Sequence, residues 1–230
     1  GAPADRVGVT GNMKFDRTPA SLSAEQVSHI RTQFHLMPTD RLWIAGSTHP
    51  GEEELILDIY QNIRKAHPSL RLLLAPRHPE RAAEVEKKIL CRGMTCHRFS
   101  QSDQPGAPDE VILLDVMGQL SRLYSLADLV VMGKSFIGWG GQNPLEPAAF
   151  AKPVVFGPHM ENFREASSIL LDHQGAVQVQ DTGELEKVVI RWLDNPEEAL
   201  RCGANALKAI RSRQGATRRN LELIEQLLKS

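Results

Sequence analysis

The sequence predicts an α/β fold built on one parallel sheet of about six strands, with helices on both faces. Short runs rich in Val, Ile and Leu recur along the chain, and longer segments of helical period separate them. Strands this apolar must be covered by other elements on both faces. Strands that alternate with helices are typical of a parallel, doubly wound sheet. The 230 residues, 41% hydrophobic and 24% charged, are sufficient for one such domain.

The expected elements follow from apolar runs, turn residues and periodicity. MTCHRFS, residues 94–100, is the weakest of the apolar runs. The strands are expected at residues 41–47, 70–76, 94–100, 111–115, 128–133, 153–158 and 176–180. The helices are expected at residues 19–37, 52–67, 79–93, 118–127, 143–151, 162–174, 183–193 and 196–229.

Several of these helices are supported by their periodicity or by residues typical of helix ends. Val27, Ile30 and Phe34 lie near a 3.6-residue period in the first helix. The second helix has acidic residues in its first turn and basic residues in its last, which matches the helix dipole. Gly93 is a typical residue to end the third. We therefore expect one Rossmann-like domain over residues 19–230.

The first 18 residues differ from this pattern. Small residues typical of an artificial leader come first, and a strand-like VGVTG follows. We expect this segment to lie outside the domain and the chain to be part of a longer protein.

Composition excludes several classes of protein. The formal net charge is −1, from 27 basic and 28 acidic side chains, so a surface that neutralises many nucleic-acid phosphates is not expected. Cys91, Cys96 and Cys202 are too few for a disulfide framework and favour a reducing compartment. Cys91, Cys96 and His97 have no second ligand pair at metal-site spacing, so no metal is expected. No apolar run approaches the roughly 20 residues of a membrane span.

Four loops follow strands of the expected sheet and should meet at one rim. They are AGSTHPGEE, APRHPER, DVMGQL and GGQNPLEP. Ligands of parallel sheets bind beyond the carboxyl ends of the strands, where loops meet helix N-termini. This rim is therefore the expected binding site.

AGSTHPGEE places three small or hydroxylated residues, Gly46, Ser47 and Thr48, between a strand and a helix. Their amides and hydroxyls could face an anion, or they could simply begin a capped helix. Glu52 and Glu53 stand where a P-loop has its Lys and Ser/Thr, and they would repel a triphosphate. The sequence has no G-x-G-x-x-G for a dinucleotide.

APRHPER places Arg77 and His78 directly after a strand, between Pro76 and Pro79. An arginine fixed in this way could make a two-pronged contact to phosphate or carboxylate. A surface ion pair is the simpler interpretation. We expect ligand contact for Arg77, and His78 is a weaker candidate.

DVMGQL turns a strand into a helix through Met117, Gly118 and Gln119. Glycine allows close approach of the backbone to a ligand, and the amides at a helix start suit a phosphate or a base edge.

GGQNPLEP has the spacing of a helix start. With Asn143 as N-cap, Pro144 falls at the first helical position and Glu146 at the third, the spacing of a capping box. The flexible Gly140 and Gly141 precede it, and a carboxylate on this rim could also accept two hydrogen bonds from a ribose diol. From the residues alone, capping and ligand binding are both open for Glu146.

GPHMENF follows the next strand and contains His159, Glu161, Asn162 and Phe163. A helix cap by Glu161 or Asn162 is the favoured interpretation, with sugar contact as the alternative.

Four motifs in one order carry a resemblance to a known family. They are VTGNMKFD, APRHPER, MGQL and GGQNPLEPAAFAKPVVFGPHMENF. With them the chain resembles the bacterial Kdo (3-deoxy-D-manno-octulosonic acid) transferases of lipopolysaccharide synthesis, which have the two-lobed GT-B glycosyltransferase fold. The resemblance runs from about Val7 to the C-terminus and covers only the family's second half. Residues 1–18 would then be an artificial leader with an interlobe linker strand.

The resemblance implies that this lobe binds the donor, CMP-Kdo. In the family, the nucleotide contacts fall on positions that are here Pro76, Arg77, Met117, Gly118, Gln119, Asn143, Pro144, Leu145 and Glu146. Gln119 stands where the family has a glutamate, which puts any role of that carboxylate in doubt. Arg77 and the helix amides would offset the charges of the phosphodiester and the sugar carboxylate, and Glu146 would hold the ribose.

The resemblance also implies the reaction. The family transfers Kdo, with inversion, to the 6'-hydroxyl of a lipid A precursor, and needs neither a cofactor nor a bound divalent metal. Its general base, a glutamate, and its acceptor groove lie in the N-terminal lobe, so we expect no catalytic base in this chain and binding of CMP without turnover. The full-length protein would work at the cytoplasmic face of the bacterial inner membrane, contacting the membrane through that lobe, whereas this fragment alone is expected to be soluble.

Two other functions remain open at this point. A GT-B lobe that binds a UDP-sugar would share the fold, since the fold does not select the nucleotide. A nucleotide-binding module without catalysis is the alternative from another class. The final helix, with Leu207, Ile210, Leu221, Ile224 and Leu228, is interpreted as packing, although the last helix of GT-B proteins often crosses to the first lobe.

Overall fold

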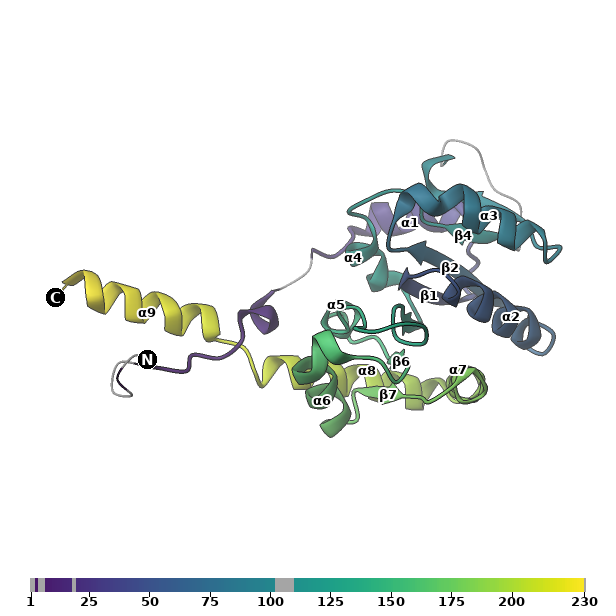
Figure 1. The fold of residues 1–230 in the computed structure, drawn as a ribbon. Helices are drawn as coiled ribbons and strands as arrows, with labels where there is room; N and C mark the ends of the chain where they lie inside the picture. Colours follow the sequence, from purple (N-terminus) through teal and green to yellow (C-terminus); the bar gives the residue numbers. More distant parts are fainter. Residues whose placement is uncertain (1–2, 4–6, 18–19, 102–109, 230) are drawn as a thin grey trace.

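The chain folds around a seven-stranded parallel sheet. This computed structural model describes residues 3, 7–17, 20–101 and 110–229. The strand order is β3-β4-β2-β1-β5-β6-β7 (Figure 1). The strands are β1 (Arg41–Thr48), β2 (Leu70–Pro76), β3 (Cys96–Arg98), β4 (Val111–Leu113), β5 (Leu129–Met132), β6 (Val154–Phe156) and β7 (Ala176–Gln178). The predicted α/β class with a parallel sheet is confirmed, and all seven apolar runs form strands, including the weak run at residues 94–100, so the estimate of about six was one too low.

The direction of winding of the sheet reverses beside β1. The chain first fills one half of the sheet with β2, β4 and β3, and then returns to the other side of β1 with β5, β6 and β7. Trp43 of β1 is in register with Leu72 of β2 on one side and with Leu129 of β5 on the other. The loops after β1, β2, β4 and β5 therefore meet where the winding reverses, which is the usual ligand position in such sheets.

Helices cover both faces of this sheet. The longer helices are α1 (Ala24–Gln33), α2 (Glu52–Arg64), α3 (Ala82–Leu90), α6 (Arg164–Asp172), α7 (Thr182–Asp194), α8 (Pro196–Arg211) and α9 (Ala216–Lys229). A hydrophobic core lies on each face of the sheet, because successive side chains of β1 point to opposite faces. Leu42 and Ile44 pack on the face of α1 and α6, whereas Trp43 and Ala45 pack on the face of α2, α3 and α7.

Two helices at the predicted rim are much shorter than expected. The helix α4 (Leu120–Leu123) and the helix α5 (Leu145–Ala148) have four residues each. A 3₁₀ turn, η5 (Tyr124–Leu126), continues α4. Other 3₁₀ turns are η2 (Met13–Asp16), η3 (Pro79–Arg81), η4 (Phe99–Gln101) and η6 (Glu161–Phe163).

The two ends of the described chain differ from the prediction. VGVTG forms no strand, since residues 7–12 have no regular structure before η2. The expected helix 196–229 is two helices, because Gly215 adopts a φ of 103° between α8 and α9. Ala216 is the one buried residue that α9 contributes, whereas Leu221, Ile224 and Leu228 are exposed, so packing does not explain them. Figure 1 shows α9 projecting from the domain with η2 beside its first turn.

Among the described residues, no helix is both long and apolar enough to cross a membrane.

Candidate functional site

A cavity of about 300 Å³ lies at the carboxyl ends of the central strands. Residues from the loops after β1, β2, β4 and β5 line it, so all four predicted loops reach one site. Of the predicted site residues, its walls contain Ser47, Pro76, Arg77, Met117, Gly118, Asn143 and Glu146. The structure thus brings Arg77 and Glu146 to a single cavity from positions 69 residues apart in the sequence (146 minus 77).

Arg77 is held by its backbone and has an uncommitted side chain. Its amide donates to the carbonyl of Thr48 at 2.9 Å, which fixes the start of the loop after β2. The side chain is exposed and makes no hydrogen bond or ion pair with the part of the chain that the structure describes. The surface ion pair considered from the sequence is therefore absent there, and the guanidinium is available to an anionic ligand.

The loop at Asn143 starts α5 differently from the predicted capping box. Pro144 is the N-cap by backbone geometry, and the Asn143 carboxamide accepts from the amide of Leu145 at 3.2 Å. The Glu146 carboxylate accepts from the Asn143 side chain at 3.3 Å instead of from a backbone amide. Because this single bond leaves acceptor capacity on a carboxylate that faces the cavity, capping does not exhaust the role of Glu146.

A buried tyrosine forms part of the cavity wall. Tyr124 is 1% exposed and packs under Gly46, where any added Cβ would collide with the tyrosine hydroxyl. Burial raises the pKa of the Tyr124 hydroxyl well above its ordinary value, with a smaller contribution from Glu146. Gly46 is therefore needed for packing, and it does not line the cavity.

The two glutamates of AGSTHPGEE point inward. Glu52 is fully buried, and its carboxylate accepts from four backbone amides: His49 at 3.0 Å, Lys134 at 2.6 Å, Ser135 at 2.9 Å and Phe136 at 3.0 Å. The carboxylate thus fixes the loop after β5 to the loop after β1. Glu52 stands at a P-loop position in the sequence, but its carboxylate faces these backbone amides and does not line the cavity.

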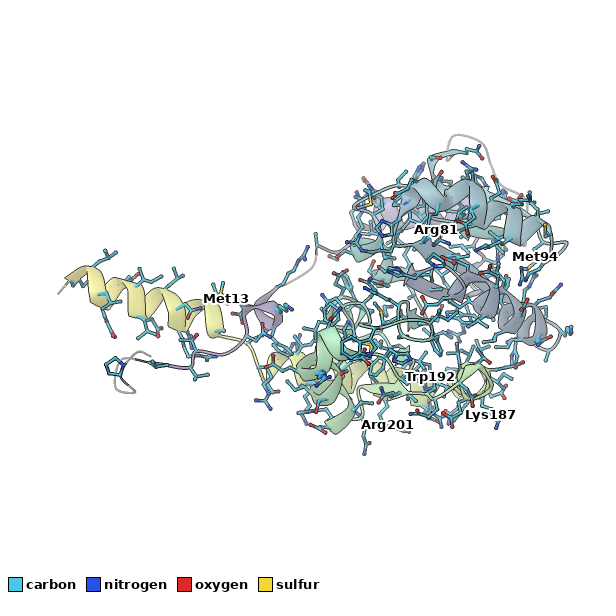
Figure 2. All side chains as sticks on the ribbon, viewed as in Figure 1. Met13, Arg81, Met94, Lys187, Trp192 and Arg201 are labelled. Carbon is cyan, nitrogen blue, oxygen red and sulfur yellow. The ribbon has the colours of Figure 1, made fainter. Side chains whose placement is uncertain are left out.

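Glu53 is also fully buried, beside a cation. It accepts from Arg81 at 2.8 and 3.2 Å and from the Thr48 hydroxyl at 3.0 Å. Arg81 lies at the start of α3, where Figure 2 labels it. Thr48 is itself fully buried, so its hydroxyl supports this pair and lies away from the cavity.

The remaining predicted residues lie around the cavity without lining it. Gly140 donates to Glu161 at 2.9 Å, and Gly141 donates to the carbonyl of Lys134 at 2.9 Å, which ties the glycine loop down. His78 contacts Glu80 at 3.4 Å on the surface.

Three predicted contacts occupy α4 and α5. Gln119 is the N-cap of α4, and its buried side-chain oxygen has no hydrogen-bond partner among the residues described. Pro144 begins α5, and Leu145 packs in the core at 5% exposure.

GPHMENF supports the glycine loop instead of capping a helix. The N-cap of α6 is Phe163, and it makes no side-chain cap bond. Glu161 accepts from Gly140, and the amide of Asn162 donates to the carbonyl of Gly140 at 2.9 Å. Neither Glu161 nor Asn162 therefore caps α6 as expected.

Cationic groups gather beside the cavity around His49. Its imidazole lies 5.9 Å from that of His78 and 3.1 Å from the amide nitrogen of Gln142. Burial first, and then the charges of Lys134, His78 and nearby arginines, lower the pKa of His49 to about 4. His49 is therefore neutral at pH 7, and the positive charge on this side comes from its neighbours.

Several cavity residues were missed by reasoning from the sequence. Arg17, Ser121, Tyr124 and Gln142 line the cavity together with the predicted residues. Ser121 and Tyr124 could have been found, because they lie on α4 and η5, directly after Gln119. Arg17 directly follows the VTGNMKFD motif, but it precedes the first strand, and only the tertiary fold brings it to the site.

Two further observations concern a metal site and the opposite edge of the sheet. Within the described part of the chain, no group of three or more His, Cys, Asp or Glu side chains is placed to hold a metal ion. A smaller hollow of about 160 Å³ lies at the opposite edge, where Asp128, Lys152 and Trp192 line it, and it contains no predicted site residue.

Comparison with known proteins shows which family this chain belongs to. No protein-family model matches the chain. A 3-deoxy-D-manno-octulosonic acid transferase of Haemophilus influenzae is 36% identical over 231 residues, which cover all of this chain and 53% of that protein. The C-terminal CMP-Kdo binding domain of WaaA from Acinetobacter baumannii has 28% identity and a TM-score of 0.74, over 86% of this chain and 99% of that domain. The chain belongs to the Kdo transferase family.

This family assignment covers part of a longer protein. The chain spans about half the length of the curated relatives it matches, 53% for the Haemophilus influenzae protein and 47% for that of Rickettsia typhi. The Anabaena protein HepE, solved with UDP and glucose, shares the fold at a TM-score of 0.64 but only 16% identity. The architecture is that of a GT-B glycosyltransferase C-terminal domain.

Proposed function

We propose that this chain is the donor-binding lobe of a Kdo transferase and that its cavity binds the CMP moiety of CMP-Kdo. The single observation that carries the proposal is that four separate loops place Ser47, Arg77, the Met117–Gly118 backbone, and Asn143 with Glu146 around one cavity of about 300 Å³. The names of the similar proteins support the choice of nucleotide and sugar.

Each wall has a role in this proposal. The Arg77 guanidinium offers paired donors to the phosphate. The Glu146 carboxylate, which within the described chain is hydrogen-bonded only to the Asn143 side chain, accepts from the ribose hydroxyls. Gly118, in the third loop, has a positive φ of 80°, which favours glycine. Because glycine has no Cβ, the nucleotide can approach the backbone closely at this position.

The reaction is completed outside this chain. We propose that the full-length protein transfers Kdo to a lipid A precursor, and that the second lobe supplies the general base and the acceptor groove. We also propose that it works at the cytoplasmic face of the inner membrane, with membrane contact made by that lobe. The chain alone then binds CMP-Kdo and CMP and does not turn over.

Calorimetric titration of the chain with CMP, UMP and UDP tests the proposal. We expect CMP to bind more tightly than UMP, and a diphosphate to gain nothing. A preference for UDP would instead assign the lobe to a UDP-sugar enzyme. Absence of binding by all three would contradict the donor-site assignment.

Replacing Arg77 with Ala tests the proposed phosphate contact. We expect CMP affinity to fall by about 1–2 kcal/mol, or roughly 5- to 30-fold, because a charge-assisted hydrogen bond is lost from an exposed side chain. Arg201→Ala removes the same charge from the exposed surface of α8 and should leave affinity unchanged. Equal affinities for the Arg77 variant and the control would contradict the role.

A further inference from the structure

The VTGNMKFD motif brings an arginine to the donor cavity, and neither the motif nor the arginine has a role so far. Arg17 directly follows the motif and lines the cavity on the side of Asn143 and Glu146, whereas Arg77 enters from the end of β2. Arg17 also lines an adjoining hollow together with Lys14. The cavity therefore has a cation from each of two separate segments.

The backbone before Arg17 is firmly anchored. Phe15 is 1% exposed and belongs to the core cluster that also includes buried residues of α6 and α8. The carboxylate of Asp16 accepts from the amides of Gly215 and Thr217, both at 2.6 Å. Figure 1 shows this turn, η2, beside the first turn of α9. Because its neighbour Asp16 is fixed, Arg17 is held at the cavity by the fold itself.

The side chain of Arg17 is uncommitted. It is exposed, and no hydrogen bond or ion pair joins its guanidinium to the rest of the described chain. Lys14, its neighbour on the same turn, lies 5.3 Å from the ring centre of Phe163 and makes no ion pair with the described residues. Among the described residues that line the cavity, Glu146 is the only acidic one. This wall therefore has an excess of positive charge.

Helix ends add little to the charge available to a ligand here. The helices that open onto the cavity, α4 and α5, have four residues each, so few peptide dipoles are aligned behind them. A nucleotide sugar whose sugar is an acid carries two anionic groups, a phosphodiester and a carboxylate. Two such groups need two cations, and Arg17 and Arg77 are the arginines that line the cavity.

We propose that Arg17 is a donor-binding residue, which pairs with an anionic oxygen of the nucleotide sugar opposite Arg77. The anchored VTGNMKFD turn is then part of the binding site as well as a connection. This inference rests on the proposed function, because it needs a donor of that class in the cavity.

The test compares cytidine, CMP and CMP-Kdo as ligands for the wild type and for Arg17→Ala. We expect the variant to bind cytidine unchanged and to lose about tenfold in affinity for CMP-Kdo. A matching loss for CMP assigns Arg17 to the phosphate, and a loss confined to CMP-Kdo assigns it to the carboxylate. Arg17→Lys should recover part of the loss, and the loss should shrink at high salt.

Controls separate a binding role from a structural one. Arg201→Ala, with its arginine labelled on α8 in Figure 2, removes a charge away from the cavity and should bind all three ligands like the wild type. Asp16→Asn keeps Arg17 but weakens its anchor, and we expect it to weaken CMP-Kdo binding less than Arg17→Ala does.

Three outcomes would overturn the inference: equal losses for cytidine and the charged ligands, no loss for either charged ligand, or a full loss in the Arg201 control. If the wild type itself does not bind CMP, the proposed function fails. If the wild type binds CMP and CMP-Kdo and Arg17→Ala binds both equally well, only the inference fails.

Discussion

Single residues at the rim act mostly by holding the loops in place. Glu52 illustrates this, because its buried carboxylate collects four backbone amides from two loops. An amide-rich turn of this kind often binds a phosphate, and here a side chain of the protein takes that position. The phosphate of a donor must then be met by side chains such as Arg77, which is consistent with a nucleotide monophosphate.

Glu52→Gln should destabilise the domain by about 2–3 kcal/mol. Glutamine keeps the volume but turns an NH₂ group toward backbone donors, and some buried amides are left without acceptors. Urea denaturation measures the change. The exposed Glu80→Gln serves as control and should stay within about 0.5 kcal/mol of the wild type. A Glu52 variant as stable as this control would show that the four bonds contribute little.

His49 should remain neutral through mildly acidic pH. Its pKa falls from 6.5 to about 4, chiefly because of burial and then because of Lys134 and His78. Between these two values the unfolded chain takes up a proton that the folded chain does not. Its contribution to stability is therefore full above pH 6.5 and is lost progressively as the pH falls toward 4.

An NMR titration of the His49 ring protons tests this pKa. We expect a midpoint near 4 in the folded chain. His49→Gln should also make the unfolding free energy less sensitive to acid between pH 6.5 and 4. A midpoint near 6.5 would mean that the ring is neither desolvated nor surrounded by cations.

At the scale of elements, close backbone contacts decide how the helices sit on the sheet. Gly203 lies inside α8, where an added Cβ would collide with the carbonyl oxygen of Ala151. Glycine is unfavourable within a helix, so its presence indicates that α8 must approach the loop before β6 closely.

Gly203→Ala should therefore destabilise the domain, by about 1–3 kcal/mol, although alanine is the better helix former. Thermal and urea unfolding measure the effect. Lys208→Ala, an exposed substitution on the same helix, should change stability by less than about 0.5 kcal/mol. A stabilised Gly203 variant would show that propensity outweighs the contact.

The elements most open to prediction were those set by local pattern. The strands at residues 41–47 and 70–76 were predicted almost to the residue, because their apolar runs are long and end at turn residues. The helices α4 and α5 were overestimated, since caps and apolar residues mark where a helix begins but not how soon tertiary packing ends it.

Some residues of the candidate site could be predicted from local sequence pattern, and others could not. Arg77 and Glu146 were selected because each follows a strand, and parallel topology brings such loops together. The inward turn of Glu52 and the approach of Arg17 depend on contacts between segments far apart in the sequence. No local pattern records such contacts, so the structure was needed to find them.

At the scale of the whole molecule, the two edges of the sheet differ in the loops, hollows and charged side chains that they carry. The carboxyl edge gathers the four loops, the cavity and two uncommitted arginines, whereas the opposite edge has a smaller hollow near Asp128 and Lys152. The helix α9 leaves the domain with exposed Leu221, Ile224 and Leu228, and it touches the rest of the chain mainly through η2. Ligand binding is therefore expected to affect one edge of the sheet.

Titrating the isotope-labelled chain with CMP, followed by amide NMR, tests this claim most directly. We expect the amides of Ser47, Arg77, Gly118 and Asn143 to shift together along one saturation curve, while those of Lys152 and Trp192 at the opposite edge stay still. Shifts centred on Lys152 and Trp192, or no saturable shift in the four loops, would contradict it.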